Sequence, residues 1–112
     1  DWRGYPDREA EEEAIARTMD GFSDAMKQGD LDASVAYILD ERRQTYRELF
    51  SANPEAMAPF ADVISSGEMS FLSEHAGPTP YHRIAEYAVK LDGFTFYVVL
   101  MKVGDSWMLY DF

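Results

Sequence analysis

The spacing of apolar residues changes once along the chain, from a helical period to a strand period near Gly67. Within residues 7–28, four apolar residues recur at intervals of four, three and four: Ile15, Met19, Phe22 and Met26. This spacing places them on one side of a long helix. Gly29 is suited to end that helix, and Asp30 to cap a short second helix with a buried side formed by Val35, Ile38 and Leu39.

Two more helices are expected before Gly67. Residues 40–51 carry apolar side chains at helical spacing, namely Tyr46, Leu49 and Phe50. Asn53 then precedes Pro54, which predicts a helix with asparagine as its N-cap and proline in its first turn. The apolar side of that helix consists of Met57, Phe60, Ala61 and Ile64. Pro59 lies inside it and is expected to kink or split it.

After Gly67 the pattern is that of strands. Residues 68–74 form a first strand-like stretch, a loop follows, and residues 81–112 alternate as strands throughout. Asp92-Gly93 and Gly104-Asp105 suit two-residue hairpin turns. Helices followed by an antiparallel meander predict an α+β fold, with the N-terminal helices packed on one face of a curved antiparallel sheet. The 112 residues are enough for one core, so we expect a single domain over 1–112.

Counting outward from the two turns predicts which residues face each other. Tyr87 faces Val98, and Val98 faces Asp111, on the more apolar face, which the helices should cover. A carboxylate is costly to bury there without a partner, so Asp111 should reach solvent, a partner or a ligand cavity. Arg83 and Lys102, beside Trp107, are expected at the rim of the same face, with a possible cation–π contact.

The opposite face of the sheet has no obvious helix to cover it. It carries apolar and aromatic residues, namely Tyr97, Met101, Met108, Tyr110 and Phe112. An exposed apolar patch indicates an interaction surface, so we expect a homodimer formed through this face. The alternative is that the N-terminal segment with Trp2 and Tyr5, or residues upstream of it, covers part of the patch.

Charge and composition narrow the possible partners. Twenty-one acidic residues against ten basic ones give a net charge of −11, which disfavours nucleic acid and anionic lipid surfaces. The absence of cysteine excludes disulfides and thiolate chemistry. No apolar run approaches the roughly 20 residues that cross a bilayer. The first residue is Asp1, from which we expect an exported protein, periplasmic or lipid-anchored, with its signal segment removed; a cytoplasmic protein with a trimmed boundary is the alternative.

Metal and cofactor sites are not expected. His75 and His82 lie seven residues apart around a Gly-Pro loop, and spacing fixes no further ligand. The acidic run Glu9, Glu11, Glu12 and Glu13 suits the solvated first turns of a helix, where the helix dipole favours negative charge.

Two stretches carry a resemblance to a known superfamily. The opening "IARTMDGFSDAMKQGDLDASVAYI" resembles that of nuclear transport factor 2-like (cystatin-like α+β) domains, in which a long helix ends at Gly-Asp and a second helix follows at once. The closing "YVVLMKVGDSWMLYDF" is similar to their final hairpin, with a tryptophan strand after the turn. The resemblance implies a conical pocket between the sheet and the first helices, and dimers formed through the sheet. The superfamily includes ketosteroid isomerase and polyketide cyclase enzymes together with many non-catalytic binding domains.

Three functions are therefore weighed. The first is a non-catalytic domain that binds a small apolar or amphipathic molecule or a peptide between sheet and helices. Its candidate ligand-binding residues are Phe22, Tyr46, Arg83, Tyr87, Trp107 and Asp111. The second is an acid–base enzyme that uses Asp111 with Tyr87. The third is a dimerisation or protein-interaction module with a closed core, which uses the Met/Tyr face.

Overall fold

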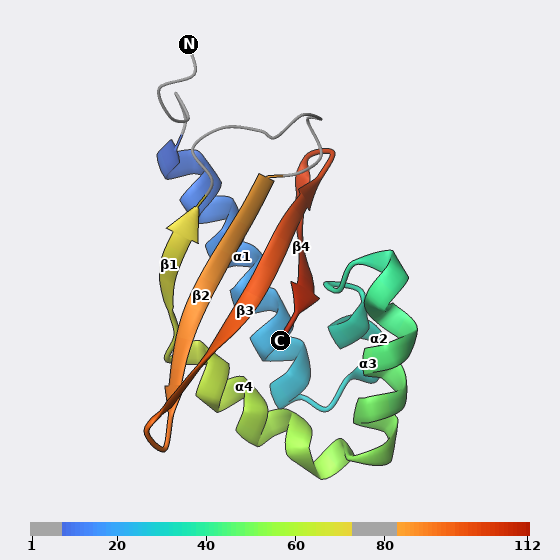
Figure 1. The fold of residues 1–112 in the computed structure, drawn as a ribbon. Helices are drawn as coiled ribbons and strands as arrows, with labels where there is room; N and C mark the ends of the chain where they lie inside the picture. Colours follow the sequence, from blue (N-terminus) through green and yellow to red (C-terminus); the bar gives the residue numbers. More distant parts are fainter. Residues whose placement is uncertain (1–7, 73–82) are drawn as a thin grey trace.

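In the computed structural model, which describes residues 8–72 and 83–112, helices come first and strands follow (Figure 1). The helical elements are α1 (Arg8–Lys27), α2 (Leu31–Val35), α3 (Asp40–Ala52), the 3₁₀ helix η1 (Pro54–Ala56) and α4 (Met57–Ser65). The strands are β1 (Glu68–Leu72), β2 (Arg83–Leu91), β3 (Phe94–Val103) and β4 (Ser106–Asp111). They pair antiparallel in the order β1-β2-β3-β4. The predicted α+β fold is confirmed.

The core lies between the sheet and α1, with α4 crossing beside it (Figure 1). The predicted stripe of α1 is buried, and Ile15, Phe22 and Met26 are 0% exposed. Opposite them the inward residues of the strands are also 0% exposed: Ala85, Val89, Val98, Leu100 and Leu109. Side chains of the core itself therefore fill much of the space between α1 and the middle of the sheet.

Both hairpins have the predicted two-residue turns. Leu91 pairs with Phe94 across the first turn, and Val103 pairs with Ser106 across the second. Asp92 and Gly93 have φ of 50° and 83°, as a type I′ turn requires. The predicted pairing of Tyr87 with Val98 is confirmed.

The predicted register is wrong at the end of β4. Leu100 pairs with Leu109 as expected, but Val99 and not Val98 pairs with Asp111, because a β-bulge adds one residue to β4. The bulge turns Phe112 toward the core, where its ring meets that of Phe22 edge-on at 5.4 Å. Asp111 is thereby displaced from the inner face, and its side chain is 61% exposed.

The Asn-Pro pair acts differently from the predicted cap. Pro54 does begin a helical segment, but the Asn53 side chain makes no N-cap bond and instead donates to the carbonyl of Leu49, 3.0 Å away. Asn53 thus closes the end of α3. Pro59 falls in the first turn of α4, where an amide hydrogen is not needed, so the helical stretch divides before it, between η1 and α4.

The segment between α2 and α3 pairs with the side of β4 that faces away from β3. Leu39 N donates to Leu109 O at 2.7 Å, and Leu109 N donates to Tyr37 O at 2.9 Å. Tyr37 then packs over α1, where a Cβ added at Gly21 would lie 2.6 Å from Tyr37 Cζ. Gly21 therefore provides the space that the Tyr37 ring occupies.

One residue of the acidic run is not solvated, which corrects the prediction for Glu11. It is 5% exposed and forms ion pairs with Arg83 at 3.1 Å and Lys102 at 2.7 Å. Its helical position faces the sheet, at one turn before Ile15, and two cations on β2 and β3 satisfy its charge. Arg83 and Lys102 thus join α1 to the sheet.

Several predictions fall on residues outside the described ranges: those for Trp2, Tyr5, His75 and His82. In residues 8–72 and 83–112, no helix is long and apolar enough to cross a membrane. Within the same ranges, no group of three or more acidic or histidine side chains is placed to hold a metal ion.

Candidate functional site

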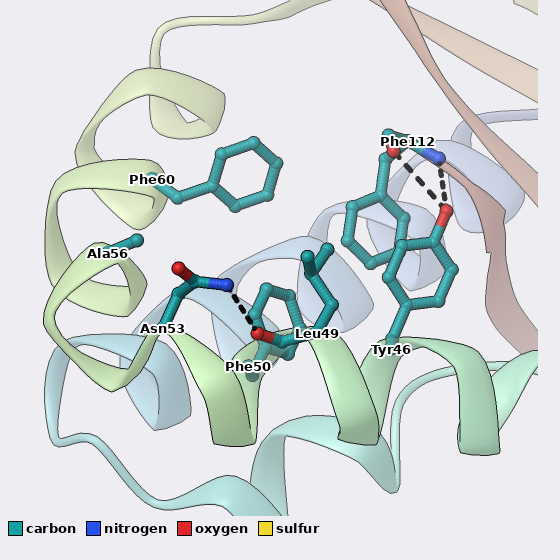
Figure 2. Close-up of a pocket in the computed structure, with 7 residues that line it drawn as sticks. All are labelled: Tyr46, Leu49, Phe50, Asn53, Ala56, Phe60 and Phe112. Atoms are coloured by element: carbon teal, nitrogen blue, oxygen red, sulfur yellow. Dashed lines mark hydrogen bonds between the residues drawn. The ribbon is translucent and has the colours of Figure 1, made fainter.

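A partly enclosed apolar cavity of about 220 Å³ lies where the end of β4 meets α3 and α4. We call it the Phe112 pocket. Its lining comes from α3, η1, α4 and the residue after β4: Tyr46, Leu49, Phe50, Asn53, Ala56, Phe60 and Phe112. Figure 2 shows these side chains around one space, with Phe60 across it from Leu49 and Phe50.

The sequence builds this pocket from helical spacing and from the bulge. Tyr46, Leu49 and Phe50 lie on one side of α3 at positions i, i+3 and i+4. Asn53 ends α3 and the chain reverses through η1, so that Phe60 on α4 comes to face the same space. The bulge in β4 supplies the remaining wall, because it turns Phe112 inward.

Phe112 is the centre of an aromatic cluster. Its ring stacks on Tyr46 with centroids 4.0 Å apart and planes 9° apart. Phe50 lies 6.4 Å away and Phe60 5.9 Å away, both stacked, and Phe22 meets it edge-on. The Phe112 ring therefore separates the closed core on the Phe22 side from the pocket on the other.

The polar atoms at the pocket are few. The hydroxyl of Tyr46 accepts from Phe112 N at 3.0 Å and lies 3.2 Å from both Asp111 Oδ1 and Phe112 O. It has one proton to donate between those two acceptors. Asn53 Nδ2 is held by the Leu49 carbonyl, which leaves Oδ1 as an acceptor on the side of Ala56 and Phe60 (Figure 2).

Asp111 lies beside this pocket and not in it. Arg42 Nε donates to Tyr110 O at 3.1 Å, and Arg42 Nη2 lies 3.4 Å from Asp111 Oδ1. The guanidinium lies 5.6 Å from the ring centroids of both Tyr46 and Tyr110. Arg42 and Tyr46 thus hold the exposed carboxylate of Asp111 from one side and fix the end of β4 to α3.

The structure brings some of the predicted site residues together and separates others. Tyr46 lines the Phe112 pocket, Phe22 lies behind Phe112 in the core, and Asp111 lies at the edge. Tyr87 lines a different cavity between α1, α4 and β2. Trp107 borders a third, open depression with Arg17 and Tyr37.

Arg83 is engaged by Glu11, away from all three cavities. The indole Nε1 of Trp107 is buried and has no hydrogen-bond partner in the described part of the chain. The predicted cation–π contact of Trp107 with Arg83 or Lys102 is not among the contacts of the described residues, where both cations are paired with Glu11.

Sequence reasoning missed most of the pocket lining. Leu49, Phe50 and Phe60 were recognised as apolar helix positions, but their spacing does not say that three elements meet without filling the space between them. Phe112 was assigned to the other face of the sheet. The sequence did contain one indication, the run of Tyr110, Asp111 and Phe112. A single bulge in this run exchanges the sheet faces of Asp111 and Phe112.

Comparison with known proteins adds little to this description. No family model matches the chain, and no curated protein matches it. Among solved structures, the chain is similar to an NTF-2 like protein of unknown function from Shewanella oneidensis MR-1. The two share 16% identity over 87% of this chain and 92% of that chain, with a TM-score of 0.39.

Proposed function

We propose that this domain is a non-catalytic binding module, and that the Phe112 pocket holds a small, largely apolar ligand. The observation that carries the proposal is the cavity itself, because aromatic and aliphatic side chains from α3, η1, α4 and the residue after β4 surround it without filling it. Concave, mostly apolar pockets with a few polar groups are the usual form of a small-molecule site.

The volume limits the size of the ligand. Drug-sized ligands occupy pockets of roughly 300–1,000 Å³, whereas an apolar cavity of about 150 Å³ is enough for benzene. A space of about 220 Å³ therefore suits a single aromatic ring with a short substituent, or a branched alkyl group. Leu49, which is 51% exposed at the rim, gives a larger amphipathic molecule or a peptide a place to continue outward.

The polar groups suggest what the substituent is. The Tyr46 hydroxyl is occupied by the end of β4, and Asn53 Oδ1 is an acceptor. A ligand with one hydrogen-bond donor, such as a phenol, would thus pair with Asn53 while its ring lies against Phe60 and Phe112.

Binding of p-cresol tests this function, with toluene as the probe that lacks the donor. We expect p-cresol to shift the amide resonances of residues 49–60 and 112, and toluene to bind more weakly. Ala56→Leu should abolish both effects, because the larger side chain fills the cavity. Ala58→Leu is the matched control, since Ala58 is exposed and does not line the pocket. Equal binding by the two variants would disprove a ligand site in this pocket.

The acid–base alternative has less support. Asp111 and Tyr87 line no common cavity among the three described above. The Asp111 carboxylate is 61% exposed and is held by Arg42 and Tyr46. A general base needs to be within reach of a bound substrate, which favours binding over catalysis here.

A homodimer through the outer face of the sheet is a second proposal. None of the described helices covers this face, on which Tyr97, Phe71 and Val103 are 51%, 49% and 45% exposed (Figure 1). Met101, Met108 and Tyr110 lie half-buried beside them. Sedimentation equilibrium should give a dimer that Met101→Glu dissociates, while Thr45→Glu on the exposed side of α3 leaves it intact. A monomer at all concentrations would exclude this assembly.

A further inference from the structure

A second cavity, also of about 220 Å³, lies between α1, α4 and β2. Its floor is apolar and includes the buried Met19 and Ile64. Its polar lining residues differ from those of the Phe112 pocket: they are Asp20, Ser23, Ser65 and Tyr87. We call it the Tyr87 cavity.

The local sequence explains why the cavity forms here. Ala16, Met19, Asp20 and Ser23 recur at helical spacing and so present one side of α1 to it. Gly67 allows the end of α4 to approach β2 closely, since a Cβ there would lie 2.9 Å from Val89 Cγ2. Tyr87 then rises from the inner face of β2 between the two helices.

The hydrogen-bonding groups of the cavity are mostly unused. Ser23 is only 7% exposed, and its hydroxyl forms no hydrogen bond with the described residues. Among the described residues the fully buried side-chain polar atom without a partner is Trp107 Nε1, so Ser23 Oγ is accessible from the cavity and can bind a molecule there. Ser65, which also lines the cavity, differs because its hydroxyl already donates to Ala61 O at 2.6 Å.

The charge in the cavity is negative. Asp20 is its charged lining residue, and Lys27, one turn beyond Ser23 on α1, is turned to Asp62 on α4, 3.7 Å away. Burial first, then the charges of Asp20 and Glu12, raise the pKa of Tyr87 above its usual value. The phenol therefore stays neutral, and the surrounding field favours a cation.

We propose that the Tyr87 cavity binds a small primary ammonium ligand. Its three N–H donors match the Asp20 carboxylate and the Ser23 hydroxyl oxygen, while the Tyr87 ring offers a cation–π contact. Its alkyl part lies on Met19 and Ile64. The ligand is of a different chemical class from that of the Phe112 pocket, and the two sites share no lining residue.

Titration with n-butylammonium chloride, followed by amide resonances of residues 16–23 and 64–67, tests this proposal. n-Butanol at the same ionic strength is the uncharged probe of similar shape. We expect n-butylammonium to bind and n-butanol not to bind. Asp20→Asn should weaken n-butylammonium binding about tenfold, as expected for the loss of one charge-assisted hydrogen bond.

Asp24→Asn is the matched control, because Asp24 is exposed one turn further along α1 and does not line the cavity. It removes the same charge from the chain, so its effect should stay below about twofold, as for an exposed charge. Equal losses in the two variants would show that the net charge alone attracts the probe and would overturn the site. Binding of n-butanol as tight as that of n-butylammonium would overturn the ammonium class.

Discussion

Tyr46 and Phe112 make two contacts: their rings stack, and the Tyr46 hydroxyl bonds to the backbone of Phe112. The rings stack at 4.0 Å, and the amide of Phe112 donates to the Tyr46 hydroxyl at 3.0 Å. A residue of α3 thereby fixes the residue that follows the last strand, 66 positions away in the sequence. The same contact sets one wall of the Phe112 pocket, so stability and site geometry are linked here.

Tyr46→Phe keeps the ring stack and removes the hydroxyl. The Phe112 amide loses its acceptor, and Asp111 loses one donor. We expect the free energy of unfolding to fall by about 1–2 kcal/mol, as for one lost hydrogen bond and a partly buried amide without a partner. Urea denaturation measures this. Tyr97→Phe, at an exposed position on the sheet, should change stability far less, and equal effects would refute the role of the hydroxyl.

Glu11→Gln removes the negative charge that Arg83 and Lys102 share. Arg83 and Lys102 would then lose the carboxylate that they share beneath α1. We expect a loss of about 2–3 kcal/mol, less than the roughly 3–5 kcal/mol for a fully buried ion pair, because both cations keep some solvent contact. Glu13→Gln, an exposed change in the same turn, should cost below about 0.5 kcal/mol. The same denaturation midpoint in the two variants would mean that the pairs of Glu11 contribute nothing.

Gly21→Ala has two effects of opposite sign on the free energy of unfolding. Alanine stabilises a helix interior by about 1 kcal/mol relative to glycine, but overpacking costs about 1–3 kcal/mol. Because the added methyl group would overlap the Tyr37 ring, we expect no gain in the native chain.

In a Tyr37→Ala background the overlap is absent, so Gly21→Ala should stabilise the chain by about 1 kcal/mol. The four unfolding free energies form a double-mutant cycle that isolates the contact. A gain of the same size in both backgrounds would show that Tyr37 moves aside without cost.

The raised pKa of Tyr87 predicts a stability change at alkaline pH. Burial is its main cause, followed by Asp20 and Glu12. Between the unfolded and folded pKa values, the folded chain holds a proton that the unfolded chain has lost. The neutral phenol therefore stabilises the fold fully below about pH 10, and this contribution is lost as the pH rises through the folded value.

Tyr87→Phe removes that proton and should flatten the fall in unfolding free energy above about pH 10. The measurement is urea denaturation at a series of pH values, with Tyr97→Phe as the control for an exposed phenol. If both variants show the slope of the native chain, Tyr87 does not titrate abnormally.

The fold could be predicted largely from local signals, and the pocket could not. Asp92-Gly93 specifies a turn by backbone sterics alone, so the pairing of β2 with β3 follows by counting. The residues at the bulge before Asp111 contact Arg42 and Tyr46, which come from a distant helix, and no pattern within β4 indicates these contacts. One inserted residue was enough to exchange the predicted sides of Asp111 and Phe112.

The burial of a charged residue could not be predicted from local sequence either. Glu11 resembles its acidic neighbours in sequence, and its difference arises only because its turn of α1 faces Arg83 and Lys102. Tyr46 was identified because a large aromatic on an apolar helix side is a good candidate wherever that helix packs. The same pattern holds for Leu49, Phe50 and Phe60. That they line a pocket depends on the shape of the space between the helices and the sheet, which the pattern does not contain.

The pairing of β4 with the segment before α3 limits how the sheet can grow. Leu109 donates its N–H to Tyr37 and accepts at its carbonyl from Leu39. The carbonyl of Tyr110 accepts from Arg42, and that of Trp107 accepts from Thr18. A strand from another molecule would find these ladder groups already engaged. Among the described strands, the margin left for addition along the sheet is that of β1, on the opposite side. With one margin blocked, edge-to-edge association ends at a pair of molecules and cannot extend into a fibril.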